Sequence, residues 1–200
     1  MRPLPLNKLF AWLLVPFCLV VALTSCSMAE EGKKGSADEK STSAETAPLK
    51  TDSALRVATA DDLQKLIKAA RGKVVLLDFW ATWCPPCVKG FPHTVKLHER
   101  HAKDGLVVIS VSMNENDSEE FAEATEFLKK QKASFTNLIS HDGGSQQAYE
   151  DFGITALPHY ILYDRQGNKH DLSGGEDDPS PSAEDLDAAV SRFLAKNSGK

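Results

Sequence analysis

Residues 78–87, DFWATWCPPC, join a buried strand to the start of a helix and decide the fold expected for this chain. They overlap the run VVLLDFW at residues 74–80, whose apolar character is typical of a strand buried on both faces of a sheet. Pro85 and Pro86 suit the first positions of a helix, where a backbone N–H has no partner within the helix. The pattern Cys-x-x-Cys in a strand–helix–strand context predicts a redox-active dithiol at Cys84 and Cys87.

The two cysteines are expected to have different roles. Cys84 stands where the helix begins, and the unpaired N–H groups and positive dipole end of a helix favour a thiolate there. Cys87 lies one turn further into the helix and should be more buried. We therefore expect Cys84 to be the attacking nucleophile and Cys87 the resolving thiol that releases a mixed disulfide. Because Pro85 and Pro86 remove two backbone donors, the Cys87 N–H should be the donor nearest to Cys84, and the pKa of Cys84 should fall only moderately.

A structural disulfide and a zinc site are both disfavoured for this cysteine pair. A disulfide between residues three apart closes a small loop and constrains the unfolded chain little, so it would be a poor structural staple. A zinc site would need two further ligands, usually a second cysteine pair or spaced histidines. The chain has four cysteines, and the remaining two, Cys18 and Cys26, lie near the N-terminus. No metal or cofactor is expected at the dithiol.

The N-terminal residues have the layout of a signal peptide. Arg2 and Lys8 precede an apolar run at residues 9–23, which is short for a helix that must cross about 30 Å of hydrocarbon. The following LTSC at residues 23–26 is similar to a bacterial lipobox, in which the cysteine becomes the lipidated first residue of the mature protein. Residues 1–25 are therefore predicted to be a lipoprotein signal peptide, and Cys26 the lipidation site. An uncleaved membrane anchor is the alternative.

The next segment is expected to be a flexible linker. Residues 26–54 are small, polar and charged, and they offer almost nothing that could be buried in a core. The formal net charge of −5 at pH 7 argues against a nucleic-acid partner, which would need a clustered basic face. The membrane would therefore be contacted through the lipid. This organisation places the protein in the cell envelope, on the extracytoplasmic (periplasmic) side.

The remaining residues, 55–198, are expected to form one α/β domain. Hydrophobic periodicity and turn signals predict helices and strands in alternation, with Thr59 or Asp61 as the cap of the first helix. The predicted helices are residues 61–72, 85–103, 118–131, 146–152 and 183–196, and the predicted strands are 74–80, 106–111, 135–139, 159–163 and 169–172. This order favours a central mixed β-sheet flanked by helices.

Several segments together resemble one known family. FWATWCPPC at residues 79–87, GITALP at 153–158 and the YDRQG turn at 163–167 are similar to thioredoxin-like proteins, in particular the membrane-anchored TlpA/ResA branch. The resemblance implies a thioredoxin-like fold with an inserted helical segment after residues 106–111. It also implies that Pro158 is a cis-proline beside the disulfide, and that the backbone of Leu157 pairs with an extended substrate segment.

Asp78 and two tryptophans are further candidates for the site. Asp78 interrupts an apolar strand, and burial there would raise its pKa and let it exchange a proton with Cys87. The alternative is a carboxylate at the sheet edge that faces water. The resemblance is mixed here, because thioredoxin has an acid at this position while TlpA/ResA-type members often have asparagine or another residue. Trp83 is expected to border the thiol and bind substrate, whereas Trp80 fits either the site or the core.

Some residues depart from the family or have an uncertain role. Gly90 occupies the position at which many TlpA/ResA-type proteins carry a glutamate. His159 could point toward the dithiol by strand alternation from Leu157, although a surface histidine is the simpler interpretation. His98 and His101 lie on one helix face, where solvent exposure is favoured over metal binding.

Three functions remain in competition at this point. The first is a lipid-anchored thiol-disulfide oxidoreductase acting on protein thiols or disulfides. The resemblance favours a reductant, for example in cytochrome c maturation or at copper-site thiols, recharged by a membrane electron donor. The second is a copper metallochaperone that uses Cys84 and Cys87, since thiolates suit Cu(I). The third is a peroxiredoxin-type peroxidase, which would need a peroxidatic cysteine in a different sequence context.

Overall fold

The computed structural model describes residues 54–173 and 180–196. The predicted signal peptide, Cys26 and nearly all of the predicted linker lie outside these residues. Across the described ranges, no helix is long and apolar enough to cross a membrane.

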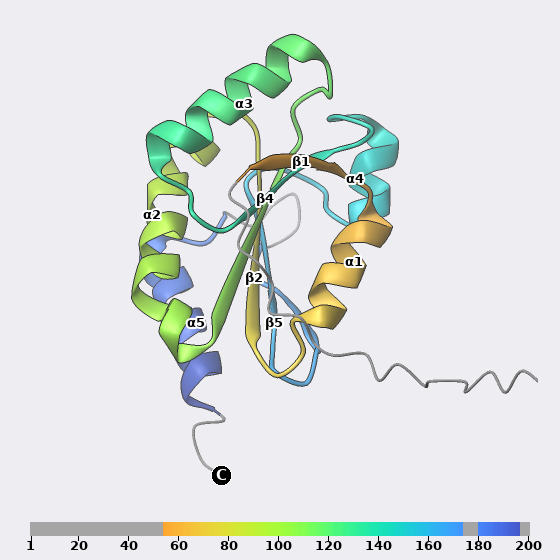
Figure 1. The fold of residues 1–200 in the computed structure, drawn as a ribbon. Coiled ribbons are helices and arrows are strands. Elements are labelled where there is room, and N and C mark those ends of the chain that lie inside the picture. The colour runs from red at the N-terminus through yellow and green to blue at the C-terminus, as the bar shows by residue number, and fades with distance from the viewer. Residues whose placement is uncertain (1–53, 174–179, 197–200) are drawn as a thin grey trace, which may run out of the picture. The chain divides into compact units, whose positions relative to one another are not determined.

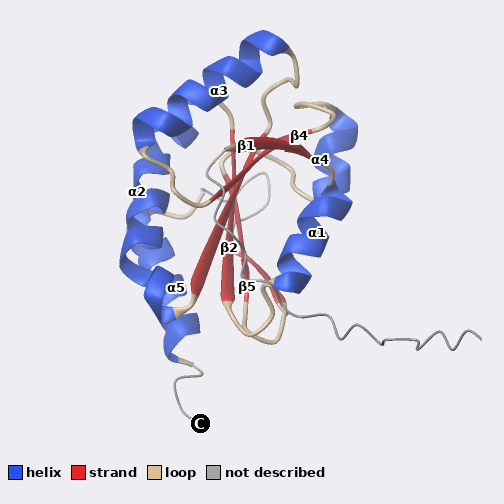
Figure 2. Cartoon of the chain, viewed as in Figure 1, coloured by secondary structure: helices blue, strands red, loops and turns tan. Residues whose placement is uncertain are grey.

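A six-stranded mixed sheet forms the centre of the domain, in the order β1-β4-β3-β2-β5-β6 (Figures 1 and 2). Strands β1, β4, β3 and β2 run parallel to one another, whereas β5 is antiparallel to both β2 and β6. This confirms the predicted central mixed sheet. The strands are β1 (Leu55–Ala58), β2 (Val74–Trp80), β3 (Leu106–Ser112), β4 (Thr136–Ser140), β5 (His159–Tyr163) and β6 (Lys169–Asp171).

Helices cover both faces of the sheet, with α2, α3 and α5 on one side and α1 and α4 on the other (Figure 2). A single 3₁₀ turn, Ala102–Asp104, follows α2. The α-helices are α1 (Ala60–Ala69), α2 (Pro85–His101), α3 (Ser118–Gln131), α4 (Gln146–Phe152) and α5 (Ala183–Ala195). The helical segment predicted after the second strand is α3, with the same bounds.

Strand β2 separates the two halves of the core. All of its side chains are buried, as its continuous apolar sequence predicts. Val74, Leu76 and Trp80 pack into the layer under α2, α3 and α5, while the alternate side chains Val75 and Leu77 pack into the layer under α1 and α4. Asp78 therefore points into the first of these layers, the one that contains both cysteines of the dithiol.

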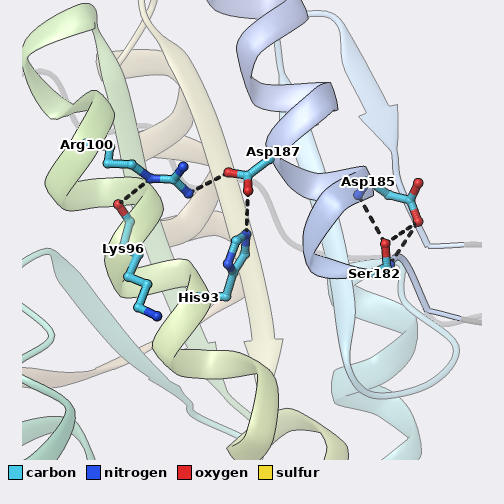
Figure 3. A network of polar contacts seen from close by, with 6 residues as sticks. All are labelled: His93, Lys96, Arg100, Ser182, Asp185 and Asp187. Atoms are coloured by element: carbon cyan, nitrogen blue, oxygen red, sulfur yellow. Dashed lines mark hydrogen bonds and ion pairs between the residues drawn. The ribbon is translucent and has the colours of Figure 1, made fainter.

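Polar contacts fasten α5 to α2 on that side of the sheet. The Asp187 carboxylate accepts a hydrogen bond from Arg100, and its other oxygen lies 3.6 Å from Nε2 of His93 (Figure 3). At the start of α5, Ser182 and Asp185 form a reciprocal capping box. The last helix is therefore held where it can cover β2 and β5.

The sequence predictions were wrong at a few boundaries and missed one strand. Strand β1 falls at the junction of the predicted linker and domain. Its two central side chains, Arg56 and Val57, are exposed, and its four residues are too few to form a clear strand pattern in the sequence. The first helix begins after Thr59, which forms a capping box with Asp62, so the Asp61 alternative was wrong. Helix α1 ends at Ala69, before the predicted end at residue 72.

Candidate active site

Cys84 and Cys87 form a disulfide at the start of α2. Their sulfur atoms are 1.99 Å apart, and their Cα atoms are separated by 5.3 Å. Cys84 is the N-cap residue of α2 and Cys87 lies in its first turn. The exposed fractions of the two residues are 5% and 2%, so Cys87 is the more buried by a small margin.

The helix start offers Cys84 a backbone donor. Pro85 and Pro86 occupy the first two helical positions, and the Cys87 N–H points at the Cys84 sulfur with a nitrogen–sulfur distance of 3.4 Å. This confirms the expectation that Cys87 supplies the nearest donor. In the reduced protein the same N–H and the helix dipole would favour negative charge on Cys84.

Asp78 is a buried carboxyl on the same side of the sheet as the disulfide. Its exposed fraction is 1%, so the alternative of a water-facing carboxylate at the sheet edge is wrong. Burial raises the pKa of Asp78 from 3.8 to about 7, and a 2.6 Å hydrogen bond from the Thr94 hydroxyl only partly opposes this rise. A carboxyl with a pKa near neutrality can accept and return a proton in the pH range at which thiols react.

The peptide bond between Leu157 and Pro158 is cis, as the resemblance implied. Strand β5 begins at the next residue and runs antiparallel to β2, with His159 opposite Phe79. This register brings Pro158 to the end of β2 at which the Cys84 loop begins. Ser180 donates a hydrogen bond of 3.2 Å to the Pro158 carbonyl, which ties the corner to the segment before α5.

The two tryptophans lie in different environments. Trp80 is fully buried and contacts the rings of Phe91 and Phe127 at centroid distances of 4.9 and 4.7 Å, so it belongs to the core. Trp83, immediately before Cys84, has an exposed fraction of 53%. It borders a shallow depression whose other lining residues are Thr82, Asp117, Glu119, Glu120 and Glu123. Trp83 is therefore the large aromatic surface beside the dithiol.

Asn114 fixes the loop that carries Trp83 and Cys84, a role that sequence reasoning missed. Its side-chain oxygen accepts a hydrogen bond from the Thr82 N–H at 3.0 Å and another from the Ser112 hydroxyl at 2.8 Å. Its amide donates to Thr82 Oγ1 at 2.6 Å and to Glu120 at 3.0 Å. An asparagine soon after a buried strand was the available signal.

Neither His159 nor His98 is part of the site. His159 is buried rather than on the surface, and its Nε2 lies 3.0 Å from the Asp171 carboxylate. Its ring packs against Phe79, on the sheet face opposite Asp78, so it does not point toward the dithiol. His98 is half-buried against Phe135 and not fully exposed on a wet helix face. In the described ranges, no three or more His, Cys, Asp or Glu side chains form a group suited to a metal ion.

Gly90 lies on α2 close to the buried hydroxyl of Tyr160. A Cβ atom at this position would approach the hydroxyl oxygen to 3.3 Å, closer than an ordinary van der Waals contact. Gly90 thus replaces the glutamate of many TlpA/ResA-type proteins at a position where the Tyr160 hydroxyl occupies the adjacent space.

Known proteins match this chain in both sequence and fold. ResA of Bacillus thuringiensis, a thiol-disulfide oxidoreductase, is 30% identical over 101 residues, covering 50% of this chain and 54% of that protein. The thioredoxin-like protein YneN of Bacillus subtilis is 31% identical over 109 residues, covering 54% of this chain and 61% of that protein. The match thus spans only about half the length of these curated relatives.

Two crystal structures show the fold. A thiol:disulfide interchange protein of the thioredoxin family from Chlorobium tepidum has a TM-score of 0.52 at 22% identity, covering 68% of this chain and 90% of that one. The thioredoxin domain of a thiol-disulfide oxidoreductase from Bacteroides vulgatus has a TM-score of 0.50 at 23% identity, covering 64% and 83%. The predicted thioredoxin-like fold is confirmed by these likenesses. The Redoxin family profile matches residues 42–190, a range that includes the sheet, the disulfide and the cis-proline corner, and the chain belongs to the Redoxin family.

Proposed function

We propose that the protein is a thiol-disulfide oxidoreductase that exchanges electrons with protein thiols or disulfides through Cys84 and Cys87. The observation that carries the proposal is the disulfide at the first turn of α2, with a buried carboxyl on the same side of the sheet. The names of relatives such as ResA support it. The reaction needs no bound cofactor, because the dithiol itself carries the two electrons.

The proposed reaction, written for a substrate disulfide, has two displacements. The Cys84 thiolate attacks one substrate sulfur, a mixed disulfide forms, and the other substrate sulfur leaves as a thiolate. Cys87 then gives its proton to the Asp78 carboxylate, and its thiolate attacks the Cys84 sulfur. The second substrate sulfur leaves as a thiolate, and the substrate thiolates take up protons, one of them returned by Asp78. Two electrons pass from the dithiol to the substrate.

Substrate docking is assigned to the surface around the disulfide. Trp83 offers an exposed aromatic face directly before Cys84. Leu157 and Pro158 offer a backbone corner at the end of β2, where an extended substrate segment could pair with main-chain groups. These contacts would hold a protein substrate while its sulfur reacts with Cys84.

The proposed setting is the extracytoplasmic side of a cell envelope. The signal-peptide layout and the lipobox-like residues 23–26 support attachment through a lipid on Cys26. A reductant there, acting in cytochrome c maturation or on copper-site thiols, would need a membrane electron donor to restore its dithiol. The family resemblance supports this direction of electron flow.

Trapping tests the proposed function. In Cys87→Ser the second displacement is impossible, so mixed disulfides through Cys84 should accumulate and be lost on treatment with reductant. Cys84→Ser is the matched control, because it keeps one thiol but lacks the nucleophile. The proposal fails if Cys87→Ser traps no more protein than Cys84→Ser. Stoichiometric binding of Cu(I) by the reduced wild type, together with that failure, would favour the copper metallochaperone.

The role of Asp78 has a separate test. Asp78→Asn keeps the size of the side chain but removes its ability to hold and return a proton. We expect the variant to resolve a preformed mixed disulfide more slowly than wild type and with a different pH dependence across pH 6–9. A resolution rate that matches wild type throughout this range would show that Asp78 does not transfer the proton of Cys87.

A further inference from the structure

Tyr160 places a buried hydroxyl next to the carboxyl of the candidate active site. It lies on β5 directly opposite Asp78 on β2, and its exposed fraction is 3%. Its side chain belongs to the same core layer as Cys84 and Cys87. From α2, the Thr94 hydroxyl hydrogen-bonds to Asp78 and also interacts with the Tyr160 side chain.

The direction of these hydrogen bonds follows from the number of available protons. The Thr94 hydroxyl has one proton, which it donates to Asp78 Oδ2 at 2.6 Å. Its oxygen can then only accept, so the Tyr160 hydroxyl donates to Thr94. Tyr160 keeps its proton because burial, followed by the nearby Asp78 charge, raises its pKa above the usual value. In this arrangement the Thr94 hydroxyl links Tyr160 to the Asp78 carboxylate.

Within residues 54–173 and 180–196, several polar groups on the neighbouring elements have partners of their own. From β3, the residue opposite Asp78 is Ser110, whose hydroxyl donates to Asn137. The polar groups where α2 meets α5 engage one another, because Arg100 and His93 both contact Asp187. On Asp78 itself, burial raises the pKa and the Thr94 hydroxyl lowers it.

We propose that Tyr160 is a positioning residue for proton transfer at Asp78, acting through the Thr94 hydroxyl. The Tyr160 proton orients the Thr94 oxygen as an acceptor, which commits the Thr94 proton to one carboxylate oxygen and leaves the other oxygen of Asp78 to exchange a proton. The Thr94 and Tyr160 hydroxyls both keep their protons when Asp78 gains or loses its own, so they position the carboxyl without taking part in the transfer. The role in proton transfer rests on the proposed function. The contacts among Tyr160, Thr94 and Asp78 do not, because they are present whatever the substrate is.

Gly90, on α2, faces the Tyr160 hydroxyl. A side chain there would meet the Tyr160 hydroxyl, since even a Cβ atom would lie 3.3 Å from its oxygen. Glycine in a helix costs stability relative to alanine, and at this position it leaves room for the Tyr160 hydroxyl. Position 90 and position 160 are therefore expected to be coupled.

The direct test is the titration of Asp78 in the oxidised full-length protein, followed by carboxyl-carbon NMR. Tyr160→Phe removes only the hydroxyl, which weakens the hydrogen bond that Thr94 gives the carboxylate, so the pKa of Asp78 should rise by about 0.5. Thr94→Val should raise it further, and Thr94→Ser should restore it. Tyr163→Phe is the matched control, because Tyr163 lies on the same strand but packs in the opposite layer. An Asp78 titration in Tyr160→Phe that overlays the wild type would overturn the proposal.

A second measurement does not depend on titration. Gly90→Ala should raise the urea midpoint of unfolding more in a Tyr160→Phe background than in wild type, because removing the hydroxyl removes the crowding. Equal shifts in the two backgrounds would overturn the coupling. Failure of Cys87→Ser to trap partners would remove the proposed function but leave the Asp78 titration result standing, so the two failures are distinguishable.

Discussion

Asp78 is a carboxyl in a strand whose other side chains are all apolar, so its protonation is linked to the stability of the fold. Burial holds the proton on Asp78 up to a pKa of about 7, against 3.8 for an ordinary aspartate. The stability that comes from the neutral form is fully present below pH 4, where the unfolded chain also binds the proton. This stability is lost as the pH rises from the unfolded pKa through the folded pKa. In that range the unfolded chain has released the proton, whereas the folded protein still retains it.

This linkage predicts the pH dependence of unfolding. Between about pH 4 and pH 7 the oxidised protein should lose about 4 kcal/mol of unfolding free energy from this group alone, at 1.36 kcal/mol for each pKa unit. Asp78→Asn, which does not titrate, should lack that contribution, whereas Asp61→Asn, a change at an exposed carboxylate, should retain it. Urea unfolding of the three proteins at several pH values measures the difference. Parallel pH profiles for wild type and Asp78→Asn would contradict the buried, protonated carboxyl.

Pro86 limits the number of donors that reach Cys84. The side chain of an N-cap residue accepts from the backbone N–H of the second or third helical position, which here are Pro86 and Cys87. Pro86→Ala adds the missing donor, so alkylation of Cys84 at pH 6 should be about three to ten times faster in the reduced protein. Pro85→Ala adds an N–H at the first helical position and is the control. Equal rates for Pro86→Ala and Pro85→Ala would show that backbone donors do not set the reactivity.

At the scale of elements, Asn114 joins the end of β3 to the loop before α2. Asn114→Ala would leave the Thr82 N–H and the Ser112 hydroxyl without their acceptor, which should cost about 2–4 kcal/mol of unfolding free energy. Asn116→Ala, at an exposed asparagine in the same segment, should cost little. Urea unfolding of the two variants gives the comparison. Similar losses in both would mean that the Asn114 contacts are not a main support of the loop.

The sequence predicted those elements whose own residues have a clear hydrophobic pattern. The bounds of α3 and α4 follow from periodicity and caps, and β2 follows from its apolar run. Strand β1 could not be found this way, because Leu55–Ala58 is short, exposed at its centre and paired in parallel with β4, some eighty residues later. Strand order and register depend on such long-range pairs, which a local pattern does not contain.

The site was predicted in part for the same reason. Cys84, Cys87 and Asp78 lie within ten residues of sequence, so their placement on one side of the sheet follows from one strand and one helix. The contacts of Thr94 and Tyr160 with Asp78 depend on how α2 and β5 pack on β2, and no motif reports that packing. The prediction for His159 was wrong because its partner, Asp171, lies on the hairpin strand β6.

At the scale of the whole molecule, the proposed lipid attachment can be separated from the thiol chemistry. Cys26→Ala in the full-length chain removes the proposed acylation site, so the protein should no longer incorporate a labelled fatty acid. Its Cys84–Cys87 dithiol should react with thiol reagents as in wild type, because neither cysteine is changed. Cys18→Ala is the control and should still be labelled. Fatty-acid labelling that is unchanged by Cys26→Ala would contradict the lipid anchor.

Strand β1 also determines how the domain would respond to mechanical load. It follows directly on the proposed tether and has one neighbour in the sheet, β4, with which it makes four register pairs from Leu55 with Asn137 to Ala58 with Ser140. A pull on the N-terminal segment would therefore first open the pair at Leu55 and then detach this edge strand. Helix α1 and β2 would take up tension only after the last pair had parted. Strand β1 would thus detach first under load, before a force transmitted along the tether reached β2 and the dithiol.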